Sequence, residues 1–256
     1  MGQAGGKMAL FWHLGQDEEL EEAEVEKVFP FLQEKNHVIS LVGGGGKTTL
    51  MYFLADRFSR KGCRTIVTTT THIFMPEQAG RYAKDCEQAV RLWEDGSYAV
   101  IGSPAEHGKL TMPSGDLLHS CMELADIVLA EADGAKRLPC KVPAEHEPVI
   151  LPESDVVIGV MGMKAFGKSL KDVCFRYEHA MRLLKTESEG HCLTAEDMAQ
   201  ILSSESGTRK YAGQCAYYAA VNQCDTQEQR QAGREILKML NQTGISGAVL
   251  AKLKSE

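Results

Sequence analysis

HVISLVGGGGKTTLM, residues 37–51, contains the feature that decides the fold of this 256-residue chain. Four consecutive glycines, Gly43, Gly44, Gly45 and Gly46, follow an apolar run that is typical of a buried strand. Each glycine costs about 1 kcal/mol relative to alanine inside regular structure. We therefore expect a turn here, in which the backbone comes close to a ligand or adopts angles that other residues avoid.

Lys47, Thr48 and Thr49 follow the glycines and open a helix predicted over residues 47–61. A strand, a glycine turn and a helix N-terminus form a phosphate cradle, because backbone N–H groups and the helix dipole favour an anion. We expect Lys47 to reach the β and γ phosphates of ATP or GTP and the Thr48 hydroxyl to bind Mg²⁺. The four glycines and Thr49 complete the predicted nucleotide site.

The spacing departs from the commonest phosphate-loop pattern, since Leu41 occupies the position of its first glycine. The form G-G-x-G-K-T-T fits better, and it runs from Gly43 to Thr49. Many proteins of that form carry a lysine directly before the glycines. Val42 stands there, so dimerisation through such a lysine is not supported. A dinucleotide fingerprint is disfavoured because its last glycine would fall on a threonine.

Short runs rich in β-branched residues alternate with helical patterns along the rest of the chain. Several runs are apolar on both faces, which indicates strands of a mostly parallel sheet flanked by helices. We predict an α/β fold, a three-layer sandwich like that of P-loop NTPases, in a single domain over residues 1–256 with a helical excursion at about 163–214. Strands are expected at 37–43, 64–71, 97–102, 125–134, 155–162, 216–225 and 247–254, and helices at 17–35 with an interruption at Pro30, 77–94, 177–187, 194–202 and 226–242.

Two acidic residues in the stretch ADIVLAEADG, residues 125–134, form the second candidate group. Glu131 and Asp133 follow four apolar residues at the C-terminal end of a predicted strand, where open parallel sheets bind ligands. Period-2 alternation points both carboxylates to the same face. We expect them to act with Lys47 in catalysis, with Asp133 on the Mg²⁺ side. E-A-D-G also resembles the D-x-x-G turn that senses a γ-phosphate, and the alternative is a turn with solvated acids.

Threonines end the second predicted strand in VTTTTHIF, residues 67–74. Thr69, Thr70 and Thr71 suit a strand as well as a phosphate site, because β-branched residues are common in strands. Thr70 is our candidate for the nucleotide site. The role of His72 stays open between a loop histidine and a catalyst.

Asn222 and Asp225 in VNQCD, residues 221–225, form the third candidate group. Their spacing resembles the N-K-x-D element in which an Asp carboxylate accepts two hydrogen bonds from guanine. Gln223 replaces the lysine of that element, so the match is partial. The sequence therefore leaves ATP and GTP both open.

Two weaker constellations remain. A basic group follows the fifth predicted strand and is either a solvated surface or a mobile anion-binding lid; it consists of Lys164, Lys168, Lys171 and Arg176. Cys140 and His146, beside two prolines, form a metal pair only if further ligands join them.

Composition narrows the classes of protein. The net charge of -7, from 28 Lys and Arg against 35 Asp and Glu, argues against a broad nucleic-acid surface. No apolar run approaches the roughly 18 residues of a membrane span. The eight cysteines include no C-x-x-C pair, which is typical of reduced thiols rather than a disulfide framework. We expect a cytoplasmic protein and leave its oligomeric state open.

The sequence resembles the YqeC family, described as accessory proteins of selenium-dependent molybdenum hydroxylases. The resemblance covers most of the chain from about residue 35 and is carried by LVGGGGKTTLM, VTTTTHIF, EADGAKRLPCKVPAEHEPVI and VNQCD. It implies a cytoplasmic P-loop protein whose partner is such a hydroxylase or the machinery that inserts its molybdenum cofactor. The E-x-x-G turn also resembles that of nickel-enzyme maturation GTPases, an analogy of fold alone.

Three functions fit these residues. The first is an Mg²⁺-dependent NTPase that drives maturation of a metallocofactor. The second is a phosphotransferase that passes the γ-phosphoryl group to a small acceptor, since the same loop serves both chemistries. The third is a module in which nucleotide binding orders a docking surface without hydrolysis.

Overall fold

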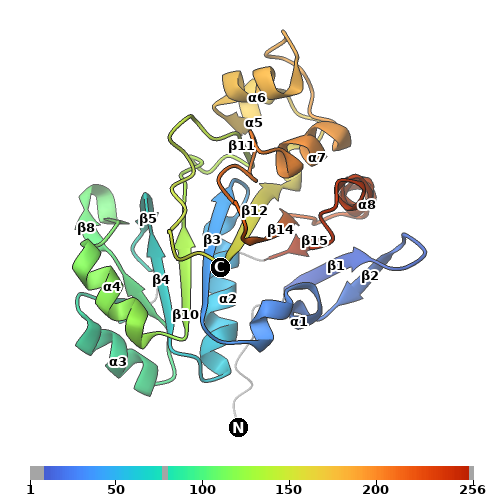
Figure 1. The fold of residues 1–256 in the computed structure, drawn as a ribbon. Helices are drawn as coiled ribbons and strands as arrows, with labels where there is room; N and C mark the ends of the chain where they lie inside the picture. Colours follow the sequence, from blue (N-terminus) through green and yellow to red (C-terminus); the bar gives the residue numbers. More distant parts are fainter. Residues whose placement is uncertain (1–8, 77–79, 254–256) are drawn as a thin grey trace.

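The computed structural model describes residues 9–76 and 80–253 and confirms the predicted α/β class. Its centre is a ten-stranded sheet of order β2-β1-β15-β14-β12-β3-β10-β4-β7-β6 (Figure 1). Every neighbouring pair from β15 to β6 is parallel. At the other end of the strand order, β1 pairs antiparallel with both β15 and β2. The parallel strands are β3 (His37–Gly43), β4 (Thr65–Thr69), β6 (Tyr82–Ala83), β7 (Ala99–Ile101), β10 (Ile127–Glu131), β12 (Val156–Gly162), β14 (Ala216–Asn222) and β15 (Ala248–Lys252).

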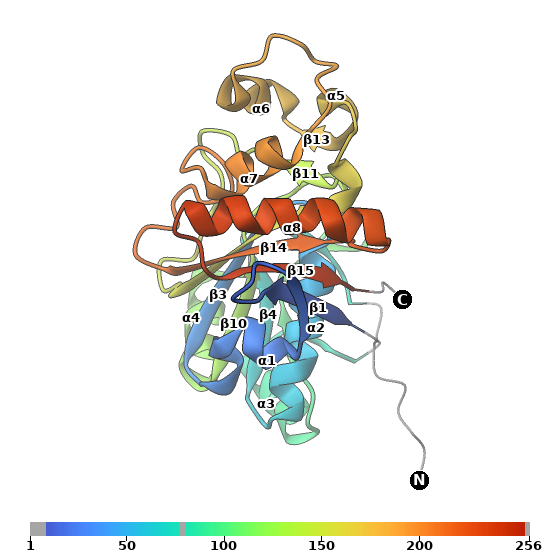
Figure 2. The same ribbon diagram turned by 90° about the vertical axis from the view of Figure 1, so that its right-hand side faces the viewer.

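Helices cover both faces of this sheet. On one face, α2 (Lys47–Arg60) packs Leu50, Leu54 and Phe58 against strand residues such as Leu129. The other face is covered by two pairs of helices, α3 (Cys86–Glu94) with α4 (Gly115–Leu124), and α7 (Ala195–Ser203) with α8 (Gln227–Gln242). Figure 2 shows α8 running along the outside of β14 and β15. The result is the three-layer sandwich that the sequence predicts.

The excursion at 163–214 lies beyond the carboxyl ends of the parallel strands (Figure 1). It contains η3 (Met163–Ala165), α5 (Leu170–Val173), β13 (Cys174–Phe175), α6 (Tyr177–Leu184) and α7. β13 pairs in parallel with β11 (Cys140–Lys141), a short strand from the segment that follows β10. The excursion is therefore joined to the strand ends at which the candidate residues lie. A separate small sheet consists of β5 (His72–Phe74), β8 (Ser103–Ala105) and β9 (Lys109–Thr111). It also lies near the carboxyl ends of the parallel strands (Figure 1). The short η2 (Glu106–Gly108) joins β8 to β9.

The expected acidic helix at 17–35 is wrong. Its first part is β2 (Leu20–Ala23), which forms a hairpin with β1 (Leu10–Leu14), and only α1 (Val25–Val28) and the short η1 (Pro30–Gln33) are helical. Glu21 and Glu22 are exposed on an edge strand, where charge discourages pairing with another chain. The expected helix at 77–94 begins only at Cys86, after β6, and residues 77–79 lie outside the described part.

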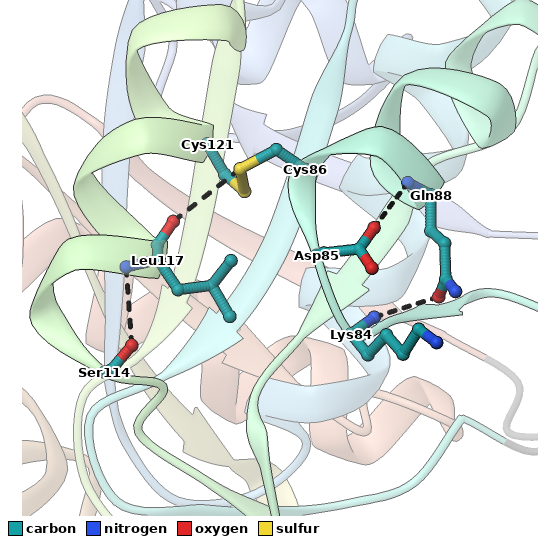
Figure 3. The surroundings of a disulfide bond; sticks show 7 residues. All are labelled: Lys84, Asp85, Cys86, Gln88, Ser114, Leu117 and Cys121. Atoms are coloured by element: carbon teal, nitrogen blue, oxygen red, sulfur yellow. Dashed lines mark hydrogen bonds between the residues drawn. A yellow bond between two sulfur atoms is a disulfide. The ribbon is translucent and has the colours of Figure 1, made fainter.

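The expectation of reduced thiols throughout is also wrong. Cys86 at the start of α3 and Cys121 in α4 form a disulfide (Figure 3). The figure also shows the caps that fix these helix starts, with Asp85 accepting from the Gln88 N–H and Ser114 accepting from the Leu117 N–H. The bond therefore joins two neighbouring helices of one layer. Within the described part of the chain, no helix is long and apolar enough to cross a bilayer.

We predict that reducing this disulfide lowers the free energy of unfolding by about 4 kcal/mol, because it closes a loop of 35 residues and restricts the unfolded chain accordingly. Urea unfolding of oxidised and reduced protein measures the difference. The exposed Cys192 serves as a control, since Cys192→Ser leaves the difference unchanged. Coincident unfolding curves for the two redox forms would contradict the prediction.

Candidate functional site

The glycine loop joins β3 to α2 in a conformation that requires glycine. Gly43, Gly45 and Gly46 have φ angles of 97°, 72° and 113°, in the left-handed range that other residues rarely adopt. A Cβ on Gly45 would lie 2.0 Å from the backbone nitrogen of Gly162, and one on Gly46 would lie 2.3 Å from the Asn222 amide. The run of glycines is therefore explained by close backbone approach as well as by backbone angles.

The backbone amides of the loop fall into two groups. The Gly44 N–H donates to Val160 O at 2.8 Å and the Gly45 N–H to Leu138 O at 3.1 Å, and the Gly43 N–H donates to the Asp133 carboxylate. Among the described residues, the amides from Gly46 to Thr49 have no protein acceptor. They belong to the first turn of α2, where N–H groups lack partners within the helix. The first three glycines shape the loop, and the amides open to an anion are those from Gly46 onward.

Lys47 lies inside the loop, with only 3% of its side chain exposed. Its Nζ donates to Gly43 O at 2.6 Å and lies 3.1 Å from Asp133 and 3.7 Å from Glu131. Burial alone would lower the pKa of Lys47, but the two carboxylates outweigh it and raise the pKa above its usual value. The lysine is therefore a buried cation, and the sequence correctly groups it with both acids.

Glu131, at the end of β10, joins this group through the first turn of α2. The Thr48 hydroxyl donates to Glu131 Oε2 at 2.6 Å. Burial raises the pKa of Glu131 above its usual range, while Lys47 and Thr48 oppose this rise. Glu131 and Asp133 thus place carboxylate oxygens beside the Lys47 ammonium group, and the Thr48 hydroxyl contacts Glu131. Carboxylate and hydroxyl oxygens are ligands that suit Mg²⁺.

A second buried lysine extends the charged group toward the excursion. Lys141 in β11 is fully buried, with Nζ 3.1 Å from Asp133 and 2.9 Å from Glu147. Arg176, which precedes α6, donates a hydrogen bond from Nη2 to Glu147 Oε1 at 3.1 Å, and its Nε lies 3.1 Å from Glu147 Oε2. Acids and bases therefore alternate from Glu131 to Arg176. We call these six residues the ion-pair chain; in order they are Glu131, Lys47, Asp133, Lys141, Glu147 and Arg176.

Sequence reasoning missed the middle of the ion-pair chain. Lys141 stands in the apolar stretch PCKVPA, and a lysine in such surroundings is a signal of a buried, paired cation. Glu147 was missed because no repeating pattern connects it with Lys141, and because its other charged partner, Arg176, is 29 residues away. Its pKa lies below the usual range: burial pushes it up, but hydrogen bonds from Lys141, the Ala144 N–H and Arg176 push it down further.

Asn222 contacts the loop, whereas Asp225 does not. The Asn222 amide donates to Gly45 O at 3.1 Å, and its Oδ1 is buried without a hydrogen-bond partner among the described residues. Because Gly45 O accepts, the amide orientation is fixed and Oδ1 is an open acceptor. Asp225 is exposed, and its carboxylate makes no hydrogen bond or ion pair with the described residues.

Thr69, the last residue of β4, and Thr70, directly after it, both donate their hydroxyl groups to backbone carbonyls. Thr70, our candidate, donates its hydroxyl to Val149 O at 2.7 Å, while the Thr69 hydroxyl donates to Glu131 O. Thr49 is partly buried in the first turn of α2, and His72 is exposed on β5. Thr49 therefore lies beside the glycine loop because it follows the loop directly in sequence. The Thr70 hydroxyl is already used in a hydrogen bond to the backbone.

The remaining predicted residues do not form one site. Lys164 and Lys168 are exposed, Lys171 pairs with Glu189, and Arg176 belongs to the ion-pair chain. Cys140 is buried with its Sγ 3.3 Å from Cys174 Sγ, and this contact, together with burial, raises the pKa of the Cys140 thiol. His146 is exposed. No group of three or more potential metal-binding His, Cys, Asp or Glu occurs within residues 9–76 and 80–253.

The fold and site define a three-layer α/β protein in which a glycine loop, a buried lysine and two strand-end acids meet at the centre of a parallel sheet. The model of the YqeC protein family matches residues 39–178, and the chain belongs to this family. It is also 28% identical over 229 residues to a protein of Escherichia coli strain K12 described as an uncharacterized protein YqeC. That match spans 87% of this chain and 90% of the relative. The family resemblance inferred from the sequence is confirmed.

We predict that Gly45→Ala destabilises the protein by about 3 kcal/mol, because the added methyl group overlaps backbone atoms. Gly96→Ala is the matched control: both glycines have a φ of 72°, but nothing lies within 4 Å of a Cβ on Gly96. The control should cost about 1 kcal/mol from backbone strain alone. Chemical denaturation of the two variants measures both values, and equal losses would contradict the packing argument.

We predict that Glu147→Gln lowers the free energy of unfolding by about 2 kcal/mol at pH 7, through lost charge-assisted hydrogen bonds. The folded-state pKa of Glu147 is depressed, so its contribution is present above the unfolded value of about 4.5 and is lost as pH falls through the folded value. The difference between variant and wild type should therefore shrink below pH 4.5. Denaturation at pH 7 and pH 3.5 checks this sign.

Glu189→Gln is the control, because Glu189 and its partner Lys171 are both more than half exposed and such pairs contribute little. A loss for Glu147→Gln that is as large at pH 3.5 as at pH 7 would show that shape rather than charge is responsible.

Proposed function

We propose that this protein is an Mg²⁺-dependent P-loop nucleotide-binding protein that hydrolyses ATP or GTP. The observation that carries the proposal is the position of Lys47, whose ammonium group lies between the glycine loop and the two acids at the end of β10. Thr48 contacts one of these acids. These are the residue types that bind phosphates and their metal ion, held together at the carboxyl edge of a parallel sheet.

The chain offers a fitting cradle for phosphates. The four amides from Gly46 to Thr49 have no acceptor within residues 9–76 and 80–253, and they lie at the N-terminus of a 14-residue helix. The helix dipole adds attraction for an anion at this end. Asn222 Oδ1, at the end of β14, is buried and has no hydrogen-bond partner among the described residues. The exposed carboxylate of Asp225 follows it and would offer acceptors to the donor edge of a base.

Thr48, Glu131 and Asp133 are the residues that would hold Mg²⁺ in this proposal. The ion would polarise phosphate oxygens and neutralise charge that develops in the transition state. Because both acids are now paired with Lys47, a divalent cation would compete with the lysine for them. Lys47 would then be free to turn from the carboxylates to the β and γ phosphates, which links metal binding to phosphate binding.

The family suggests the biological role. The YqeC resemblance links such proteins to selenium-dependent molybdenum hydroxylases, and we propose that nucleotide hydrolysis drives a maturation step of such an enzyme in the cytoplasm. The partner would be the hydroxylase or its cofactor-insertion machinery. The excursion over the carboxyl edge is a fitting place for it, because Arg176 ties this region to the loop acids through Lys141 and Glu147.

We predict that Lys47→Ala weakens binding of Mg²⁺-ATP or Mg²⁺-GTP by about 10- to 100-fold, the equivalent of one charge-assisted hydrogen bond. Calorimetric titration measures this loss. Lys84→Ala, at an exposed lysine, is the charge-matched control. Thr48→Ala removes a metal ligand with less disturbance of the buried charges, and it should abolish the dependence of affinity on Mg²⁺.

Phosphate release and the choice of base complete this test. Asp225→Ala should remove any preference for GTP over ATP, because a site that hydrogen-bonds one base rejects the other strongly. Failure of the wild-type protein to bind either nucleotide would overturn the proposal. Binding without release of phosphate in single turnover would instead favour a non-hydrolysing module.

A further inference from the structure

Two consecutive cations follow the acids of β10 and take no part in the ion-pair chain. Lys136 and Arg137 are exposed and have φ angles of 49° and 63°. Side chains other than glycine rarely adopt this left-handed conformation, and strained residues gather at functional sites. Two such residues in succession, both cationic, indicate that the turn is built to present their side chains.

Each of these cations rests on an aromatic ring. The Lys136 Nζ lies 4.9 Å from the centroid of Phe175, and the Arg137 Cζ lies 4.9 Å from that of Phe74. Lys109 also contacts Phe74, with its Nζ 5.3 Å from the centroid. Cation–π contacts hold a charged group in place without neutralising it. The turn therefore presents two fixed positive charges.

These charges have no acidic partner among the described residues, whereas the neighbouring cations do. Within the ion-pair chain, three acids balance Lys47, Lys141 and Arg176. No ion pair joins Lys136 or Arg137 to a described carboxylate. In a chain with a net charge of -7, an uncompensated basic pair marks a place for an anion.

The turn lies directly beside the glycine loop. Asp133, three residues before Lys136, accepts from the Gly43 N–H, and Leu138, directly after Arg137, accepts from the Gly45 N–H. Pro139 O in turn accepts from the Gly162 N–H at 2.7 Å. The segments before and after the turn are thus hydrogen-bonded to the glycine loop, while Lys136 and Arg137 lie in the exposed middle of the turn.

We propose that Lys136 and Arg137 bind the phosphate group of a second small molecule, a phosphorylated compound held next to the nucleotide. An arginine fork and a lysine together match a phosphate dianion in charge and in hydrogen-bond donors. The inference rests on the proposed function only for the identity of the neighbouring ligand. It names a class of acceptor, a phosphorylated compound, for the phosphotransferase that is our second candidate function.

The test uses inorganic phosphate as the probe and keeps the two sites apart. In a Lys47→Ala background, which weakens phosphate binding at the glycine loop, binding of inorganic phosphate is followed by calorimetry and by ³¹P NMR. We expect affinity within about threefold of the wild-type value measured with the loop saturated by a non-hydrolysable Mg²⁺-nucleotide. Adding Lys136→Ala and Arg137→Ala should weaken phosphate binding at least tenfold, as loss of charge-assisted hydrogen bonds requires.

Lys164→Ala/Lys168→Ala is the control of equal charge change at two exposed lysines of the excursion, and it should leave the affinity unchanged. If Lys47→Ala does not fold, the same comparison is made in the wild-type background with the nucleotide analogue present. Phosphate binding that survives loss of Lys136 and Arg137, or that falls equally in the control, would overturn the inference.

A third result would also overturn it. If Lys136→Ala/Arg137→Ala weakens the nucleotide analogue at least tenfold and bound analogue excludes phosphate, the two cations serve the nucleotide itself. Failure of the proposed function is distinguishable, because phosphate would then bind at Lys136 and Arg137 although neither ATP nor GTP binds at the loop.

Discussion

The arrangement of the site depends on the contacts of the Asp133 carboxylate. It accepts the N–H of Gly43 and pairs with Lys47 on one side and Lys141 on the other, while only 2% of the side chain is exposed. Removal of one partner from a buried ion pair costs about 3 to 5 kcal/mol, because it leaves an uncompensated charge. The positions of the glycine loop, of α2 and of β11 therefore depend on one another through Asp133.

This dependence joins parts of the chain that are distant in sequence. Lys47 begins α2, Lys141 lies in β11, and Glu147 receives Arg176 from the start of α6. If a metal ion took the place of Lys47 beside Asp133, the electrostatic environment of the next residue in the ion-pair chain, Lys141, would change as well. The excursion is placed to respond, since its β13 pairs with β11.

The sequence predicts well where local pattern and chemistry agree. β3, the glycine loop and α2 follow from an apolar run, four glycines and a stripe of Leu50, Leu54 and Phe58, and Glu131 and Asp133 follow from their place at a strand end. The β1–β2 hairpin was missed because LEEA is acidic and helix-favouring, and pairing with β1, which itself pairs with β15, overrides that preference. Lys141 and Glu147 were missed because pairs between distant residues leave no periodic signal.

The hairpin gives the sheet a further property. Leu10 of β1 lies opposite Lys252 of β15, so strands from the two ends of the chain are neighbours. During synthesis on the ribosome, β1 and β2 emerge before β15, and the hairpin has no partner among the parallel strands until β15 has emerged. Such non-local pairing is slow, because loop closure must precede it. This edge of the sheet therefore forms only after β15 has been synthesised, and the nascent chain carries a hairpin that is not yet attached to the parallel strands until then.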